Sequence, residues 1–411
     1  MRIVIAPQEF KGSLAASQAA AAMAEGARRA LPEAKLETVP MADGGPGTVE
    51  AVVEASGGRT VTATVQDPLG RPVTAQWGIV EGQTAVPVRR GVIEMAEAAG
   101  LWRLAEEERN PRVTSTYGVG QLALAALDVG CRRLIIGLGG SATNDGGAGM
   151  AAALGARFLD AEDHELAPGG AALARLERID ASGLDQRLRQ CEVIAATDVT
   201  NPLCGPEGAS LVYGPQKGAG PEAARELDAA LRHYGEIVER DVGVQVLDVP
   251  GAGAAGGLGA GLIAFLGARI EPGVEVVART VRLSERLRGA VPSAGLPGRA
   301  QTGPRPGAGR ASLVLTGEGR LDGQTGYGKT VAGVARIAAA EGVPVIVVVG
   351  SLGPGWERVL KLGVAGVEPI VPRSGTLEDA MARPAEMLAT TVARAVDGWL
   401  RIRAMAGARD E

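Results

Sequence analysis

The sequence predicts an α/β protein of two domains, one of which is discontinuous along the chain. Near both ends, short apolar runs alternate with Ala-rich segments, which is typical of the strands and helices of a mostly parallel sheet. The middle of the chain opens instead with closely spaced β-rich stretches, which favour hairpins. Because 411 residues suffice for two domains, we expect residues 1–60 and 295–411 to form one α/β domain and residues 61–294 an inserted α/β domain.

The discontinuous domain is expected to begin with a buried strand at residues 2–6, which Pro7 ends. Ser13 is then expected to cap an Ala-rich helix that stops before Pro32. A strand, a tight loop and a helix to residue 54 follow. The same alternation of apolar strands and helices is expected near the other end of the chain. The expected ranges are 36–41 and 43–48 for this strand and loop, then 312–315, 330–340 and 343–349 for a strand, a helix and an apolar strand.

The inserted domain is expected to begin with short strands and to continue with strands that lead into glycine-rich loops. The expected strands are at 61–65, 73–80, 84–92, 133–137 and 193–196. The uncharged run 251–268 holds too little Leu, Ile or Phe for a bilayer span, so we expect a glycine-rich loop and a close-packed helix there. The Pro- and Gly-rich stretch 291–310 is expected to be a flexible connection back to the first domain.

Composition excludes several classes of protein. The net charge of −5 leaves no basic footprint for nucleic acid. Three cysteines without CxxC spacing and two histidines argue against a zinc site and favour buried thiols in a reducing cytosol. Glu9 and Lys11 interrupt the N-terminal apolar region, so it is not a signal peptide. We expect a cytoplasmic protein with neither nucleic-acid nor membrane partners.

Glycine-rich polar loops follow several of the predicted strands, at the edge where open α/β sheets bind ligands. Only five of the 42 basic residues are Lys, and Lys11, Lys217 and Lys329 lie in such loops. A cation beside a helix N-terminus attracts anions. Each glycine alone also suits a turn or a helix cap, but the loops together predict a shared anion-binding site.

Two segments match nucleotide-binding patterns without their usual context. Residues 323–330 match the phosphate-binding GxxxxGKT pattern, but the strand predicted at 312–315 ends several residues earlier, which argues against a true P-loop fold. We still expect this loop to contact phosphate. Residues 251–256 fit GxGxxG but lack a preceding strand and an acidic ribose partner, so close backbone packing is the better interpretation, with a ligand-lining role open.

Three aspartates, Asp145, Asp198 and Asp322, occupy places where a strand leads into a loop. A carboxylate there can orient a hydroxyl nucleophile or hold Mg²⁺. The alternative is that each caps turn amides. We favour the functional role for Asp198 and Asp322 and leave both roles open for Asp145.

An ordered set of motifs runs from residue 2 to about residue 350. It comprises residues 3–7, 10–13, 40–45, 47–48, 139–150, 201–203, 214–219, 248–259, 316–320 and 322–325, together with Asp198. In this order the motifs resemble the bacterial glycerate kinase family, the type I glycerate 2-kinases. The resemblance implies ATP-dependent phosphorylation of D-glycerate, most often on the 2-hydroxyl to give 2-phosphoglycerate. It also implies two α/β domains, one of them flavodoxin-like, with the active site in the cleft between them.

The resemblance and the loop chemistry together give a set of expected site residues. The expected catalytic residues are Asp198, Lys11, Asp322 and Arg320, with Asp198 and Asp322 as the candidate Mg²⁺ ligands. The expected cofactors are ATP and Mg²⁺, and a homodimer is allowed. The expected substrate- and nucleotide-binding residues are Ser13, Asp43, Gly44, Gly45, Ser141, Asn144, Asp145, Asn201, Lys217, Gly253, Glu318, Gln324, Thr325 and Lys329.

The chain departs from the family pattern in a few places. Gln8 and Glu9 stand where the family usually has Asp-Ser, and Pro46 stands where it usually has Glu. Residues 87–90 resemble a short insertion, and residues 294–310 lengthen a connection. The changes at Gln8 and Glu9 border the Lys11 loop and can shift the preference among hydroxy acids. The rival functions are a P-loop NTPase and a non-catalytic protein that binds a nucleotide or hydroxy acid.

Overall fold

The computed structural model describes residues 1–81, 88–290, 309–323, 330–371 and 377–407. It divides into two compact units, which we call unit 1 and unit 2. Unit 1 comprises residues 1–43, 50–57 and 274–411, and unit 2 comprises residues 44–49 and 58–273. These units are defined by contacts within the structure. That the chain folds as two domains with limits at residues 60 and 294 stays a prediction.

Unit 1 is built on a five-stranded sheet in which every pair of neighbours is parallel. Its order is β13-β12-β11-β1-β2, with bounds β1 Arg2–Ile5, β2 Lys35–Thr38, β11 Leu313–Leu321, β12 Val345–Leu352 and β13 Val364–Pro369. Numbered along the chain within this unit, that is the 2-1-3-4-5 order of flavodoxin-like folds. The direction of winding reverses between β1 and β11, which defines a switch point.

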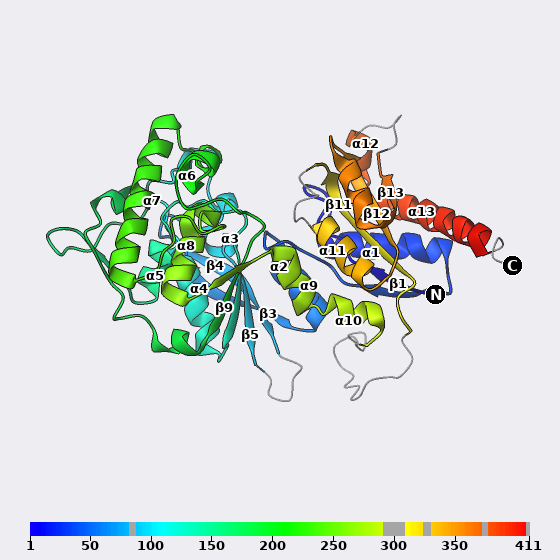
Figure 1. The fold of residues 1–411 in the computed structure, drawn as a ribbon, viewed down its shortest axis with the longest axis horizontal. Helices are drawn as coiled ribbons and strands as arrows, with labels where there is room; N and C mark the ends of the chain where they lie inside the picture. Colours follow the sequence, from blue (N-terminus) through cyan, green and yellow to red (C-terminus); the bar gives the residue numbers. More distant parts are fainter. Residues whose placement is uncertain (82–87, 291–308, 324–329, 372–376, 408–411) are drawn as a thin grey trace. The chain divides into compact units, whose positions relative to one another are not determined.

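Helices cover the sheet of unit 1 because its central strands, β1, β11 and β12, are largely buried on both faces. Ile3 and Ile5 of β1 belong to one apolar core with α1 and α13, which lie side by side in Figure 1. The intervening Val4 is buried outside that core, and α11 contacts β11 and β12. The helical bounds are α1 Ala16–Ala30, α2 Thr48–Ser56, α9 Gly273–Thr280, α10 Leu283–Arg288, α11 Thr330–Ala340, η7 Trp356–Leu362, α12 Leu377–Ala382 and α13 Pro384–Gly407.

Two local expectations for unit 1 were wrong. Helix α1 begins at Ala16, and Ser13 does not cap it; the Ser13 hydroxyl donates to the Phe10 carbonyl in the preceding turn, at 2.8 Å. Strand β11 does not end at residue 315 but continues to Leu321, because Arg320 and Leu321 still pair with Ser351 and Leu352 of β12. Residue 323 therefore follows the strand almost directly, so the position of this strand does not argue against a P-loop.

Unit 2 contains a six-stranded mixed sheet of order β10-β9-β6-β5-β4-β3. The first four strands in this order are mutually parallel, whereas β3, β4 and β5 are joined antiparallel, as the β-rich start of this region predicted. A small antiparallel pair, β7 with β8, stands apart. The bounds are β3 Arg59–Gln66, β4 Pro72–Val80, β5 Arg90–Glu94, β6 Arg133–Gly137, β7 Arg157–Leu159, β8 Arg178–Asp180, β9 Glu192–Ala196 and β10 Arg269–Glu271.

The helices of unit 2 enclose a large core with this sheet, built mostly from Ala, Val, Leu and Ile, and a small separate cluster holds Ala219, Ala224 and Leu227. Helix α7 shows how the sequence sets its ends: Pro221 occupies the first turn, and Gly243, with φ of +78°, closes the last one. The helical bounds are α3 Ala96–Ala99, η1 Leu101–Arg103, η2 Glu106–Glu108, α4 Tyr117–Asp128, α5 Ala148–Ala153, η3 Gly170–Arg175, η4 Gln186–Gln190, α6 Ala209–Tyr213, η5 Pro215–Lys217, α7 Pro221–Val242 and α8 Ala254–Leu266.

Helix α8 confirms the glycine-rich loop and buried helix expected at residues 251–268. No helix in the portions of the chain that the structure covers combines the length and apolar character that crossing a bilayer requires. Parts of three expectations fall outside those portions: the flexible connection within residues 291–308, most of the GxxxxGKT loop, and residues 84–87 of the third β-rich stretch. The described part of that stretch has its strand at Arg90–Glu94.

Candidate functional site

In unit 1 the loop after β1 lies between the loop after β2 and the second half of strand β11, at the carboxyl edge of the parallel sheet. The backbone N–H of Gln8 donates to the Gly317 carbonyl at 2.9 Å, and that of Met41 donates to the Pro7 carbonyl at 2.9 Å. The loop after β1 is thus held between its two neighbours. It stands at the switch point of the sheet, where α/β folds of this order bind ligands.

The loop after β1 gathers charged side chains around Lys11. The Gln8 amide Nε2 donates to Asp43 Oδ2 at 2.9 Å, which ties the loop after β1 to the loop after β2. Burial raises the pKa of Glu9, the nearby Asp43 carboxylate raises it further, and Lys11 opposes both effects. Lys11 is exposed, and its backbone lies beside Gly319 of β11: a Cβ on Gly319 would come within 3.1 Å of the Lys11 backbone nitrogen.

The end of β11 brings three further expected residues to the same edge. Arg320 is exposed over 66% of its side chain, and its Nε lies 3.7 Å from Asp322 Oδ2. Glu318 is buried within the strand. Unit 1 therefore brings together Lys11, Asp43, Glu318, Arg320 and Asp322, with Ser13 in the adjoining turn, whereas Gln324, Thr325 and Lys329 lie outside the described residues.

In unit 2 the expected glycines Gly44 and Gly45 lie against the carboxyl ends of β6 and β9. The Gly139 N–H donates to the Gly44 carbonyl at 3.2 Å. A Cβ on Gly44, whose φ is +90°, would collide with the Ala196 carbonyl, and a Cβ on Gly139 would come within 2.5 Å of the Gly45 Cα. The backbone around Gly44 and Gly45 approaches those of Gly139 and Ala196 so closely that Gly44 and Gly139 leave no room for a side chain.

Asp145 is buried in unit 2, with 1% of its surface exposed, and its carboxylate accepts hydrogen bonds from the starts of two helices. Its donors are the Thr116 N–H and hydroxyl, at 2.8 and 2.9 Å, and the N–H groups of Gly147 and Gly149, at 3.2 and 3.3 Å. Burial raises the pKa of this carboxyl, and these donors oppose the rise. The arrangement fits the capping alternative for Asp145, since it serves the first turns of α4 and α5.

The same loop, residues 139–147, carries Ser141 and Asn144, both buried. The Asn144 Nδ2 donates to the Ser210 hydroxyl at 2.9 Å. Lys217 is also buried, and its Nζ donates to the Thr143 carbonyl at 2.7 Å. Burial lowers the pKa of Lys217 to about 7, and the Asp145 carboxylate opposes that change.

Asp198 follows β9 at the carboxyl edge of the unit 2 sheet. Its Oδ1 accepts a hydrogen bond from the Gly273 N–H at 2.9 Å, at the start of α9. Asn201 donates to the Glu207 carbonyl at 2.6 Å and accepts from the Tyr213 hydroxyl at 2.9 Å. A Cβ on Gly253 would collide with the Pro202 carbonyl, so this glycine permits the close packing expected of residues 251–256.

Some polar residues of these edges were missed by sequence reasoning. Glu94 ends β5, and its carboxylate accepts the Val49 N–H at 2.7 Å. The Tyr234 hydroxyl donates to the Gly146 carbonyl at 2.9 Å from α7. Glu94 could have been found from the sequence, because a Glu at the end of an apolar strand is unusual. Tyr234 could not, because a tyrosine in a long amphipathic helix has no local feature that indicates a polar role.

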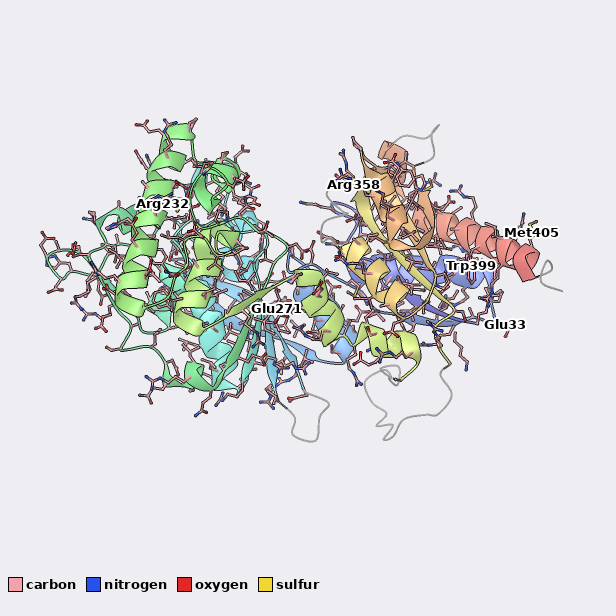
Figure 2. The ribbon with its side chains drawn as sticks, in the orientation of Figure 1. Glu33, Arg232, Glu271, Arg358, Trp399 and Met405 are labelled. Atoms are coloured by element: carbon pink, nitrogen blue, oxygen red, sulfur yellow. The ribbon has the colours of Figure 1, made fainter. Side chains whose placement is uncertain are left out.

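Other features of unit 2 lie away from the expected residues. A hollow of about 330 Å³ on α6 and α7 is lined partly by Arg232, labelled in Figure 2, with Asp228, Glu236 and His233, so its charges are of mixed sign. The three cysteines are free thiols. Among the residues that the structure describes, no three His, Cys, Asp or Glu side chains gather as a metal cluster.

Comparison with known proteins settles the family. The model of the glycerate kinase family matches residues 3–292 and 303–400. The chain belongs to the glycerate kinase family. It is 48% identical over 379 residues to a glycerate kinase of Halalkalibacterium halodurans, covering 92% of this chain and 93% of that protein. It is 46% identical over 381 residues to the glycerate 2-kinase of Escherichia coli, with 92% and 93% covered.

A solved structure agrees with this family assignment. A crystal structure described as that of a glycerate kinase 2 from Salmonella typhimurium LT2 matches with a TM-score of 0.82 and 44% identity, covering 98% of this chain and 99% of that one. The family resemblance expected from the motifs is confirmed, and so are the α/β fold with its mostly parallel sheets and the assignment as a kinase.

Proposed function

We propose that this member of the glycerate kinase family transfers the γ-phosphoryl group of ATP to D-glycerate, on the 2-hydroxyl, to give 2-phosphoglycerate. The observation that carries the proposal is the loop cluster at the switch point of the unit 1 sheet, with the exposed cations Lys11 and Arg320 beside Asp43 and Asp322. The match to the family over most of the chain supports the same activity. We expect it in the cytoplasm, where its free thiols stay reduced.

Phosphoryl transfer demands positioning and charge neutralisation more than covalent help from the protein. Lys11 and Arg320 are our candidates to bind anionic oxygens, because both are exposed at the sheet edge. The planar guanidinium of Arg320 suits the two oxygens of the glycerate carboxylate. Lys11 lies at the end of the loop after β1 and suits a phosphate oxygen or the same carboxylate.

Mg²⁺, when bound, would neutralise the ATP phosphates. In proteins this ion is typically held by one or two carboxylates together with phosphate oxygens and water. Asp198 in unit 2 and Asp322 in unit 1 are separate candidates to supply such a carboxylate, since each follows the carboxyl end of a parallel strand. One of these carboxylates would also accept a hydrogen bond from the substrate hydroxyl and orient it towards the phosphorus.

The P-loop NTPase remains the rival that one observation favours. Strand β11 ends at Leu321, so Gly323, the first glycine of the GxxxxGKT pattern, follows a parallel strand almost directly. Dependence on the acceptor separates the two functions, because an NTPase releases phosphate from ATP without any hydroxy acid.

The decisive assay follows ADP release from the purified chain with ATP and Mg²⁺, with and without D-glycerate, and reads the product by phosphorus NMR. We expect turnover only with glycerate, and a product phosphorylated on the 2-hydroxyl. L-glycerate and glycolate serve as acceptor controls. Equal ADP release with and without glycerate would overturn the proposal and favour the NTPase.

A further inference from the structure

Lys217 is the buried cation of unit 2 that the proposed chemistry does not use. Only 1% of its surface is exposed, although it ends the short helix η5 between two glycine-rich turns. Its backbone is fixed on both sides: a Cβ on Gly214 would collide with the Ser210 carbonyl, and a Cβ on Gly218, whose φ is +95°, would collide with the Arg109 carbonyl. The chain therefore presents this side chain inward.

The Lys217 ammonium contacts the loop of residues 139–147 through a hydrogen bond to a backbone carbonyl. Its Nζ donates to the Thr143 carbonyl at 2.7 Å, and the buried Asp145 carboxylate is its neighbouring countercharge. Burying an ammonium is costly, and the lowering of the pKa of Lys217 to about 7 reflects that cost. Packing alone is served at least as well by an apolar side chain of the same length.

The Thr143 carbonyl has little room to move. A Cβ on Gly256, whose φ is +69°, would collide with this oxygen, and the Gly256 carbonyl accepts the Gly146 N–H at 3.0 Å. The same loop is tied by Asn144 to Ser210 and by Gly146 to Tyr234. Without Lys217 the Thr143 carbonyl would lose a charged donor in a buried place where it cannot turn to another one, so the hydrogen bonds of this loop should open more often.

We propose that Lys217 is a positioning residue, which fixes the loop of residues 139–147 through the Thr143 carbonyl in the geometry that phosphoryl transfer requires. This inference rests on the proposed function, because the loop follows β6 at the carboxyl edge of the sheet, next to Gly44 and Gly45. It differs from direct phosphate binding by Lys217, since an ammonium that is 1% exposed and donates to the Thr143 carbonyl does not reach a ligand.

The test compares Lys217→Met, which keeps length but loses the donor, with Lys217→Gln, which keeps a neutral donor on a shorter chain. We expect Lys217→Met to lower kcat by about 10- to 100-fold, the scale of a misplaced site, with KM for ATP and glycerate within about threefold. Lys217→Gln should lose less, and it carries the test if Lys217→Met does not fold. Hydrogen exchange of the amides at 139–149 should speed up about tenfold in Lys217→Met.

Thr280→Val is the matched control, because Thr280 is a buried donor to the Val276 carbonyl within α9. It should lower the melting temperature while kcat and loop exchange stay at wild-type values. A folded Lys217→Met or Lys217→Gln with wild-type kcat and wild-type loop exchange would overturn the inference, whatever its melting temperature. A wild-type chain that does not phosphorylate glycerate overturns the proposed function instead, and loop exchange then still decides whether Lys217 fixes the loop.

Discussion

Replacing Asp198 by Asn and by Ala separates a catalytic carboxylate from a helix cap. Its Oδ1 accepts the Gly273 N–H at 2.9 Å, so the residue has a structural role whatever its chemistry. Asn keeps an oxygen at this place and loses only the charge, whereas Ala loses both. The two variants therefore differ in stability but share the loss of a carboxylate.

The hydrogen bond from Gly273 gives the structural loss expected in each variant. A negative charge at a helix N-terminus contributes about 0.3–1 kcal/mol, and this is what Asp198→Asn gives up. In Asp198→Ala the Gly273 N–H also loses its acceptor, which costs about 1–3 kcal/mol if no water replaces it. Since 1 kcal/mol lowers the melting temperature of a unit of this size by about 2–4 °C, calorimetry resolves the difference.

The catalytic loss is expected to be larger and nearly equal in both variants. If Asp198 holds Mg²⁺ or orients the substrate hydroxyl, losing its charge should lower kcat by about a hundredfold or more. The coupled assay measures kcat and KM on protein well below its melting temperature. An Asp198→Asn protein with wild-type kcat would remove Asp198 from the reaction, and normal kcat in both variants with early melting of Asp198→Ala alone would leave it as a helix cap.

Three further predictions concern stability. Arg286→Met removes one of the two arginines that pair with Glu37, since Arg2 remains, and leaves the Val281 and Ala55 carbonyls without its guanidinium donors; it should cost about 1–3 kcal/mol in denaturant unfolding. Glu9→Gln should raise the melting temperature at pH 7 but not below pH 4.5: burial and Asp43 raise the pKa of Glu9, so the native state loses stability as pH rises above the unfolded value of 4.5. Gly256→Ala should cost about 3 kcal/mol or more in the same denaturant assay, because its Cβ meets the Thr143 carbonyl at positive φ.

Each of these predictions has a control or an outcome that contradicts it. Arg29→Met breaks an exposed ion pair with Glu25 and should lower the free energy of unfolding by less than about 1 kcal/mol. If Arg286→Met lowers it by no more than Arg29→Met does, the prediction for Arg286 is wrong. Gly57→Ala, at φ of +66° with open space around it, should cost only the backbone strain of about 1–2 kcal/mol. A stability gain in Glu9→Gln that persists at pH 4 would show that it is not electrostatic.

The sequence by itself determined the fold class and the loops. Buried parallel strands read as apolar runs such as residues 343–349, and glycines mark the places where backbones approach or turn, so both signals are local. The same reasoning failed at β11, where Gly317 and Gly319 suggest a loop. The strand continues there because β12 lies alongside and pairs as far as Leu352, which no local signal reports.

The tertiary structure decided which side chains meet. Lys11 and Lys217 both stand in glycine-rich loops, yet one is exposed at a sheet edge and the other is buried against the Thr143 carbonyl. The Gln8–Asp43 hydrogen bond exists because β1 and β2 are neighbours in register. Periodicity along the chain encodes which residues are buried in each element, but strand order and packing between distant segments set the partners of each polar group, and those depend on the whole fold.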